Sequence, residues 1–344
     1  MVDDLAAIVE KAVVDRVVTE LRADGRYDAD RRLVEYDDEH VAIPVTATST
    51  HPDIVRFEPG VTERRRPRTL EALLRRRGWS AAEVDLVPSS YARLGHVIAF
   101  NEPIEHRPGA VCEALFDLHG DARTVLSIEA IEGARRRPEV RHVGGERTTR
   151  VRHREHGTVY EFDLEEVMFS PGNQHERVRM GRVVGRDERV LDMFAGIGYF
   201  TLPMARSGAR VTAIERNPRS FRWLSLNLTH NAVDRRVVPI RGDCRAVPVQ
   251  ADRVVLGHLP VHDTRDGTPR DDGYLERALD ALIDGGTLHV HGIDWADRSA
   301  RAASALEERI HRLGWTVADL EVRRVKGLAP RTDHLVFDVR VEPA

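Results

Sequence analysis

The stretch Val190 to Pro203, VLDMFAGIGYFTLP, constrains the fold of this chain more than any other segment. It predicts a buried strand that ends at Asp192, a turn containing Gly196 and Gly198, and a helix over Tyr199 to Ala205. Glycines let the backbone of such a turn approach a ligand without obstruction by a Cβ atom, and the start of the helix presents free N–H groups. This order is typical of the ligand-binding edge of a parallel α/β sheet. The alternative interpretation is that the glycines only shape a tight turn.

Acidic residues that follow two later strand-like runs support the ligand-binding interpretation. An apolar run ends at Glu215, 23 residues after Asp192, which is the spacing at which an acid reaches ribose hydroxyls in a βαβ unit. A third run, Val237 to Ile240, is followed by Asp243 and Cys244. We therefore expect three strand ends to meet at one crevice.

The turn favours S-adenosylmethionine over a dinucleotide as the cofactor. A dinucleotide site normally reads GxGxxG, whereas the third position of that pattern, counted from Gly196, is Thr201. Phe194 stands where many methyltransferases carry their first glycine.

Length and composition bound the class of protein. A chain of 344 residues is long enough for two or three domains of about 100 to 150 residues each. Cys112 and Cys244 show neither CxxC spacing nor clustering with histidine, so we expect no disulfide framework and no metal site. No apolar run approaches the roughly 20 residues that span a bilayer. We expect a soluble, cytoplasmic protein that is a monomer.

Basic charge is carried almost entirely by arginine, although the net charge is −4. Lys11 and Lys326 are the only lysines. Arginine runs concentrate in the N-terminal half, and each is interpreted either as a solvated face or as part of a surface for a polyanion such as RNA. The runs lie at 64–68, 75–77, 135–137 and 147–154.

Residues 1–88 are predicted to form an N-terminal α/β module that is a candidate to contact an RNA polyanion. The opening MVDDLAAIVEKAVVDRVV is interpreted as an amphipathic helix, His40 to Thr46 as a strand, and Thr69 to Arg77 as a helix ended by Gly78. Pro88, Ser89 and Ser90 predict a linker.

Residues 89–165 are expected to form a small α+β domain, because short alternating runs, HVIAF, RTVLSIEAI and TVYEFDL, are separated by Gly and Pro. Residues 166–344 alternate strands and helices as in a doubly wound parallel α/β sheet. Val322 to Val325 and His334 to Val341 are predicted as a closing pair of strands, the second of them an antiparallel edge.

Several motifs in the second half of the chain resemble a known family. The similarity covers about Gly133 to the C-terminus and rests on FSPGNQHERVRM, DMFAGIGYFTLPMA, AIERNP, GDCR and EVRRVKGLAPRTDHLVFDVRV. These resemble the archaeal and eukaryotic class I enzymes that modify the purine 3′ of the tRNA anticodon. One branch consists of tRNA guanine-N1 methyltransferases. The other is the aminocarboxypropyltransferase branch of wybutosine synthesis, which has a Rossmann-like S-adenosylmethionine domain.

The resemblance assigns roles to individual residues. It implies that Arg136 and Glu176 assist proton removal from the base and that His258 touches the base or the methionine tail. Met168, where some methyltransferases carry Tyr, weakens this transfer of chemistry. The alternatives are that Glu176 forms an intrahelical ion pair, that His258 is only accommodated, and that Asp243 caps a turn. The residues implied to line the cofactor pocket are Asp192, Phe194, Gly196, Gly198, Glu215, Asn217, Asp243 and Cys244.

The motif forms favour the aminocarboxypropyl branch. The resemblance places Tyr199 where the methyltransferase branch tends to have Pro, and His258-Leu259-Pro260 where that branch has Asn-Leu-Pro or Asn-Pro-Pro. The expected reaction transfers the 3-amino-3-carboxypropyl group of S-adenosylmethionine to 4-demethylwyosine in phenylalanine tRNA. Two alternatives stay open: methyl transfer to the guanine or to a wyosine intermediate, and a non-catalytic RNA-binding protein that senses S-adenosylmethionine.

Overall fold

The computed structural model describes residues 4–63, 67–132, 137–267, 269 and 272–344. The chain divides into two compact units, Met1–Trp79 and Ser80–Ala344. This division precedes the predicted linker at Pro88 to Ser90. No helix in the described part of the chain is both long and apolar enough to cross a membrane.

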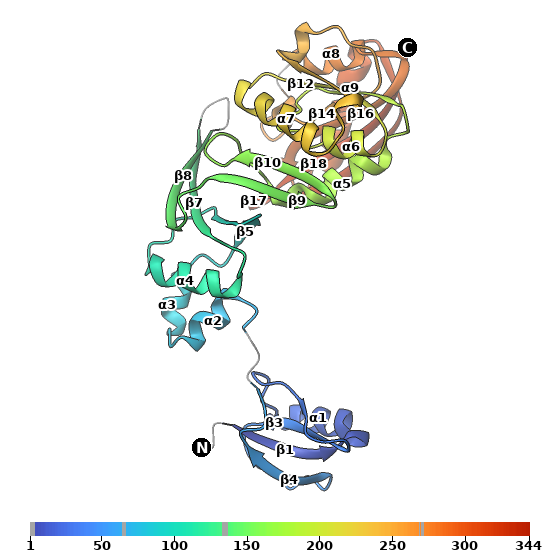
Figure 1. The fold of residues 1–344 in the computed structure, drawn as a ribbon. Helices are drawn as coiled ribbons and strands as arrows, with labels where there is room; N and C mark the ends of the chain where they lie inside the picture. Colours follow the sequence, from blue (N-terminus) through green and yellow to red (C-terminus); the bar gives the residue numbers. More distant parts are fainter. Residues whose placement is uncertain (1–3, 64–66, 133–136, 268, 270–271) are drawn as a thin grey trace. The chain divides into compact units, whose positions relative to one another are not determined.

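The first unit contains an antiparallel sheet with helix α1 packed on it (Figure 1). The strand order is β2-β3-β1-β4. The predicted strand at His40 is confirmed as β3. The elements are β1 (Leu5–Glu10), α1 (Val14–Ala23), β2 (Val34–Glu35), β3 (His40–Val45) and β4 (Ile54–Pro59).

The predicted opening helix is wrong in its first half, which forms the central strand β1. Ala6 to Val9 are fully buried. Ala7 and Val9 pack on one apolar cluster with α1, while Ala6 and Ile8 pack on another. A central strand needs apolar residues on both faces, so its sequence lacks the alternation that distinguishes a half-buried strand from a helix.

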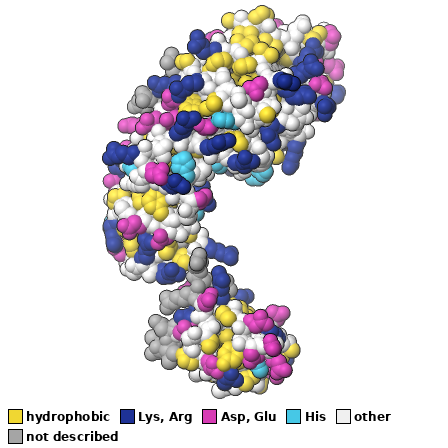
Figure 2. Space-filling model, viewed as in Figure 1, with side chains coloured by type: hydrophobic (Ala, Val, Ile, Leu, Met, Phe, Trp, Pro, Cys, Tyr) yellow, Lys and Arg dark blue, Asp and Glu magenta, His cyan; other side chains and the backbone are white. Residues whose placement is uncertain are grey.

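The predicted helix at Thr69 is confirmed as α2 (Leu70–Arg76). The hydroxyl of Thr69 accepts a hydrogen bond from the N–H of Ala72 at 3.2 Å, and Gly78 follows the helix with a φ of +86°. Arg75 forms an ion pair with Glu71 one turn away, as on a solvated helix face. Figure 2 likewise shows basic side chains interspersed with acidic ones on the visible face.

The second unit begins with a mixed four-stranded sheet of order β5-β6-β7-β8, followed by the β9–β10 hairpin. The predicted strands HVIAF, RTVLSIEAI and TVYEFDL are confirmed as β6, β7 and β10. The elements are α3 (Ala81–Asp85), β5 (Tyr91–Leu94), β6 (Val97–Phe100), α4 (Pro108–Leu118), β7 (Thr124–Glu132), β8 (Arg137–Gly145), β9 (Arg150–Glu155) and β10 (Thr158–Asp163).

The rest of the unit is built on a doubly wound sheet of order β13-β12-β11-β14-β16-β18-β17. This confirms the predicted fold class. The helices are α5 (Gln174–Val183), α6 (Thr201–Arg206), α7 (Pro218–His230), α8 (Tyr274–Asp280) and α9 (Ser299–Arg312). The strands are β11 (Arg189–Asp192), β12 (Arg210–Glu215), β13 (Val237–Arg241), β14 (Ala251–Leu256), β15 (His262–Asp263), β16 (Leu282–Trp295), β17 (Trp315–Ala329) and β18 (Thr332–Pro343).

The prediction that the last strand lies at the edge of the sheet is wrong. β18 is antiparallel to β16 but lies between β16 and β17, so β17 is the edge. After β16 the chain first forms the edge strand β17. A tight turn then leads into β18, which pairs with both β16 and β17. A sequence pattern gives strand order along the chain but not the order of pairing.

Alternate residues of the parallel strands face two different cores. Val190 and Val211 pack with α6 and α7, whereas Leu191 and Ile214 pack with α8 and α9. The first core also contains residues of the β5–β8 sheet and the β9–β10 hairpin, including Tyr160. Packing therefore continues across residue 165, where the sequence predicted a domain boundary, and the domain limits stay an interpretation of the sequence.

Two buried asparagines, Asn227 in α7 and Asn231 directly after it, hold the β9–β10 hairpin. The amide of Asn227 accepts from the N–H of Glu161 at 2.7 Å and donates to the carbonyl oxygens of Glu161 and Ile197, both at 3.1 Å. Asn231 accepts from the N–H of Val159 at 2.9 Å and donates to its carbonyl oxygen at 2.7 Å. Asn227 thus joins the hairpin, α7 and the glycine turn.

We expect Asn227→Ala to lower the free energy of unfolding by about 3 kcal/mol, because three buried backbone groups lose their partners. Urea denaturation followed by circular dichroism measures the change. Arg219→Ala, on the exposed surface of the same helix, is the control and should change stability by no more than about 0.5 kcal/mol. Equal effects of the two substitutions would contradict the role given to Asn227.

Candidate active site

A cavity of about 800 Å³ lies at the carboxyl ends of the parallel strands. This size is within the range of about 300–1,000 Å³ found for small-molecule sites. The strand ends meet there as the sequence predicted. Six of the predicted site residues line the cavity: Phe194, Glu215, Asn217, Asp243, Cys244 and His258.

The two turn glycines shape the site without lining the cavity. Gly196 and Gly198 have φ values of +58° and +101°. A Cβ atom on Gly196 would lie 2.5 Å from the ring of Tyr199, and one on Gly198 would lie 2.8 Å from Leu202. Because the glycines lack a Cβ atom, the turn packs closely against the start of the helix that follows it. Tyr199 and Phe200 thereby reach the cavity wall.

Asp192 is fully buried behind the turn and is absent from the cavity lining. Its carboxylate accepts hydrogen bonds from the hydroxyl of Thr201 at 2.7 Å and from the N–H of Phe194 at 3.3 Å. Burial raises the pKa of Asp192 to about 6 despite these bonds, and the nearby charge of Glu215 adds to the increase. In this structure Asp192 fixes the turn.

Glu215, at the end of β12, presents its carboxylate to the cavity in a fixed orientation. One oxygen accepts from the N–H of Gly196 at 2.8 Å and the other from the N–H of Asn217 at 2.6 Å. Burial raises the pKa of Glu215, and the two N–H donors oppose this increase. Each carboxylate oxygen has a second lone pair, so the group can accept two further hydroxyl donors.

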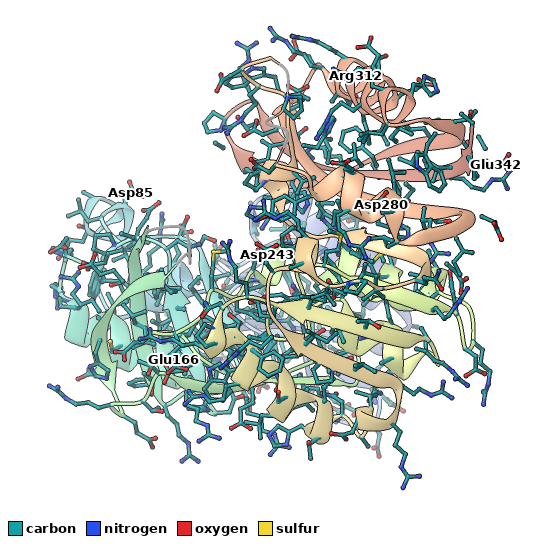
Figure 3. The ribbon with its side chains drawn as sticks, turned by 90° about the horizontal axis from the view of Figure 1, so that it is seen from above. Asp85, Glu166, Asp243, Asp280, Arg312 and Glu342 are labelled. Carbon is teal, nitrogen blue, oxygen red and sulfur yellow. The ribbon has the colours of Figure 1, made fainter. Side chains whose placement is uncertain are left out.

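Asp243 lies beyond the end of β13 (Figure 3). Its carboxylate accepts from the N–H of Arg245 at 3.0 Å and pairs with the Arg245 guanidinium at 2.7 Å, which lowers the pKa of Asp243 to about 2. Asp243 therefore caps a turn and also lines the cavity. Burial raises the pKa of the neighbouring Cys244 thiol to about 12, so this thiol stays protonated at neutral pH.

His258 follows β14 and stacks on Phe194, with ring centroids 5.1 Å apart and planes inclined by 28°. The ring of Tyr274 also packs against Phe194, with ring centroids 5.0 Å apart and planes inclined by 67°. All three rings line the cavity. Asn217 caps α7 through its side-chain oxygen, which accepts from the N–H of Arg219 at 3.1 Å.

The opposite wall of the cavity carries positive charge and was not assigned site residues from the sequence. Arg177 of α5 and Lys326 of β17 both line it. The Lys326 ammonium donates to the hydroxyl of Ser170 at 2.5 Å, and Arg177 donates to the Ser170 carbonyl oxygen at 3.0 Å. The signal in the sequence that could have indicated Lys326 was composition, because it is one of only two lysines in the chain.

A buried histidine pair lies in the same wall. Nδ1 of His291 and Nε2 of His334 are 2.9 Å apart. Burial lowers the pKa of His334 to about 4 and holds the pKa of His291 well below its usual value, so both rings are neutral at pH 7. Nε2 of His291, Nδ1 of His334 and the side-chain oxygen of Asn173 are buried without a hydrogen-bond partner among the described residues. This end of the cavity is therefore suited to a polar ligand.

Glu176 does not line the cavity. It is 4% exposed, and its oxygens accept from Arg179 at 2.7 and 3.0 Å and from Arg323 at 3.3 Å. Both arginines also pair with Asp338. The arrangement contains the intrahelical ion pair that was the structural alternative for Glu176. Arg136 lies outside the described residues.

Comparisons with known proteins agree with this geometry. The TRM5/TYW2 methyltransferase domain matches residues 151–318, and the TYW2 N-terminal domain matches residues 70–148. The tRNA(Phe) (4-demethylwyosine(37)-C(7)) aminocarboxypropyltransferase of Pyrococcus horikoshii is 34% identical over 75% of this chain and 91% of its own length.

Two solved structures are also similar. Trm5b from Pyrococcus abyssi is 26% identical with a TM-score of 0.77, covering 98% of this chain and 99% of its own. TYW2 from Methanocaldococcus jannaschii in complex with AdoMet is 29% identical with a TM-score of 0.58, covering 74% of this chain and all of its own. A cavity at the carboxyl edge of a doubly wound sheet defines an α/β ligand-binding fold. The chain belongs to the TRM5/TYW2 family.

Because the pKa of Asp192 is raised, we expect the difference in stability between the parent protein and the Asp192→Asn variant to depend on pH. Between about pH 4 and 6 the folded protein retains a proton that the unfolded chain releases, so this group's contribution to stability falls as pH rises. A shift of about two units corresponds to about 3 kcal/mol. Urea denaturation of both proteins from pH 4 to 7 should show the Asn variant gaining up to that amount relative to the parent. A constant difference would contradict the burial argument.

The ion pairs of Glu176 predict that Glu176→Gln lowers stability by about 1–3 kcal/mol. If its role is structural, Arg323→Gln should have a similar effect, and turnover by the folded fraction should stay unchanged for both. If Glu176 instead removes the base proton, Glu176→Gln alone will lower turnover while tRNA binding is retained. Denaturation and single-turnover assays on both variants distinguish these roles.

Proposed function

We propose that this protein transfers the 3-amino-3-carboxypropyl group of S-adenosylmethionine to 4-demethylwyosine at position 37 of phenylalanine tRNA, with release of methylthioadenosine. The observation that carries the choice of reaction is His258, which lies in the cavity against Phe194. By resemblance, the methyltransferase branch has Asn at this position. The named function of the Pyrococcus horikoshii relative and the match to the TYW2 N-terminal domain support the same choice.

The strand-end wall fits the nucleoside of S-adenosylmethionine. Glu215 has two lone pairs directed away from its backbone donors and would accept both ribose hydroxyls. Asp243 would accept from the adenine amine, and the ring of Phe194 offers a stacking surface. Asp192, Gly196 and Gly198 would act indirectly, since they fix the turn that carries these contacts.

The cationic wall fits the charged tail and the target base. The sulfonium of S-adenosylmethionine carries three electrophilic carbons, so the group transferred depends on which carbon faces the nucleophile. Lys326 and Arg177 would attract the tail carboxylate, and the neutral His291–His334 pair offers hydrogen bonds to the base. Neutral imidazoles suit this place because they do not repel the sulfonium.

Methyl transfer to guanine N1 is the second candidate, because similarity to Trm5b extends over 98% of this chain. A non-catalytic protein that binds S-adenosylmethionine and RNA is the alternative from another class. It is disfavoured by a cavity that has polar groups at both ends. We also infer that the protein acts in the cytoplasm, where tRNA is modified, and that it works as a monomer.

Isotope transfer distinguishes these reactions. Phenylalanine tRNA bearing 4-demethylwyosine is incubated with S-adenosylmethionine labelled either in the methyl group or in the carboxyl carbon. We expect the carboxyl label in the RNA and the methyl label in the released nucleoside, because the bond from sulfur to the aminocarboxypropyl carbon breaks. Unmodified transcript with guanine at position 37 is the control substrate and should acquire neither label. Methyl label in RNA would favour the second candidate, and neither label with bound cofactor would favour the binding protein.

A further inference from the structure

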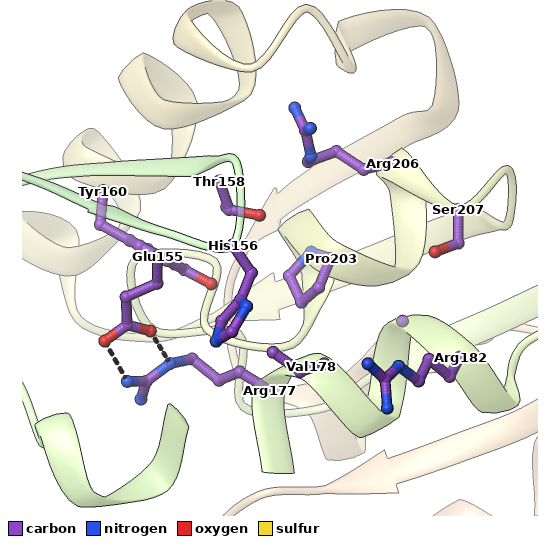
Figure 4. Close-up of a pocket in the computed structure, with 11 residues that line it drawn as sticks. Glu155, His156, Thr158, Tyr160, Arg177, Val178, Arg182, Pro203, Arg206 and Ser207 are labelled. Atoms are coloured by element: carbon purple, nitrogen blue, oxygen red, sulfur yellow. Dashed lines mark hydrogen bonds and ion pairs between the residues drawn. The ribbon is translucent and has the colours of Figure 1, made fainter. Parts of the chain in front are cut away.

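A second, smaller cavity of about 270 Å³ opens between the β9–β10 hairpin and helices α5 and α6 (Figure 4). We call it the arginine notch. Arg177 and Arg182 come from α5, and Arg206 comes from the end of α6. The notch is lined by Glu155, His156, Thr158, Tyr160, Arg177, Val178, Gly181, Arg182, Pro203, Arg206 and Ser207.

The notch has more positive charge than its acidic residue can neutralise. Glu155 is its only carboxylate, and both of its oxygens are bound by Arg177 at 2.7 and 2.8 Å. Arg182 and Arg206 make no ion pair with any carboxylate in the described ranges. Many arginines elsewhere in this chain are paired, since acidic residues outnumber basic ones by 56 to 52. Arg182 and Arg206 are both exposed and open to the same notch, where one bound anion can neutralise them together.

The floor of the notch is firmly packed. A Cβ atom on Gly181 would lie 3.0 Å from the carbonyl oxygen of Pro203, so α5 and α6 approach closely there. Gly157 at the hairpin tip leaves room for the Arg206 guanidinium, which would lie 3.1 Å from a Cβ atom at that position. Hydroxyls of Thr158 and Ser207 and the ring of His156 add hydrogen-bonding groups around the opening. Such a set of forked donors and hydroxyls matches a tetrahedral oxyanion.

We propose that the arginine notch binds a backbone phosphate of the RNA substrate close to the nucleotide that is modified. Arg177 lines both the notch and the large cavity, so the two cavities adjoin at this residue. A base in the large cavity would bring its neighbouring phosphates toward this side of the unit. Phosphate contacts fix the position of a nucleic acid without reading its sequence, which is the function required beside a reacting base. The inference rests on the proposed function.

The test compares the full-length protein with Arg182→Ala/Arg206→Ala. Arg235→Ala/Arg301→Ala is the matched control, because these arginines are exposed and also lack an ion pair among the described residues. Binding of fluorescent anticodon stem–loop RNA is measured by anisotropy across a salt series. We expect the notch variant to lose about tenfold in affinity at 0.1 M salt and its salt slope to fall by about 0.7 to 0.9, as for one lost phosphate contact. Equal affinities and slopes for the two variants would overturn the proposal.

Single methylphosphonates in the same RNA identify the phosphate. Each neutralises one phosphate near position 37. We expect one position at which the substitution weakens binding to the parent protein but has no further effect on the notch variant. Additive losses at every position would show that the arginines act only as diffuse charge, and would overturn the proposal of a defined site.

The isotope experiment separates this inference from the proposed function. If the carboxyl label is not transferred but the notch variant shows the expected binding defect, the proposed reaction is wrong and the RNA site stands. If the label is transferred and binding by the notch variant equals that of the control, the site is wrong and the reaction stands.

Discussion

The carboxylate of Glu215 is the interaction on which the rest of the site depends. It ends β12 and receives N–H groups from the glycine turn after β11 and from Asn217 at the start of α7. One side chain thereby ties together two parallel strands and the helix that follows. Because two N–H donors hold the carboxylate, its orientation toward the cavity is fixed before any ligand binds.

This arrangement has an energetic cost that packing offsets. Asp192 is fully buried and Glu215 is partly buried, and loss of solvent raises the pKa of both carboxyl groups. The surrounding turn supplies hydrogen bonds, and two apolar cores on opposite faces of the sheet hold that turn in place. Removing a carboxylate from solvent is unfavourable for stability, and unfavourable groups of this kind are expected at functional sites. The cationic wall opposite, with Lys326 and Arg177, gives the cavity the reverse polarity.

Sequence reasoning succeeded where the chemistry is local. The strand end at Glu215 follows from an apolar run that stops at an acid, Asp243 comes two residues after the next strand, and both residues line the cavity. It was less successful for Leu5–Glu10, where burial on both faces removes the alternation of a strand. For Glu176, the same sequence neighbourhood fits a group that removes the base proton and an intrahelical ion pair, and a further partner, Arg323, lies 147 residues away in the chain.

The sequence by itself determined the doubly wound sheet, the glycine turn and the acids at its strand ends, because periodicity, turn chemistry and spacing all act within a βαβ unit. Only the tertiary structure decided which distant residues share a surface. It inserted β18 between β16 and β17, brought Lys326 and His334 against Ser170 and His291, and gathered three arginines at the notch. The physical reason is that strand pairing and ion pairing across more than a hundred residues depend on the packing of the whole unit, which no local pattern encodes.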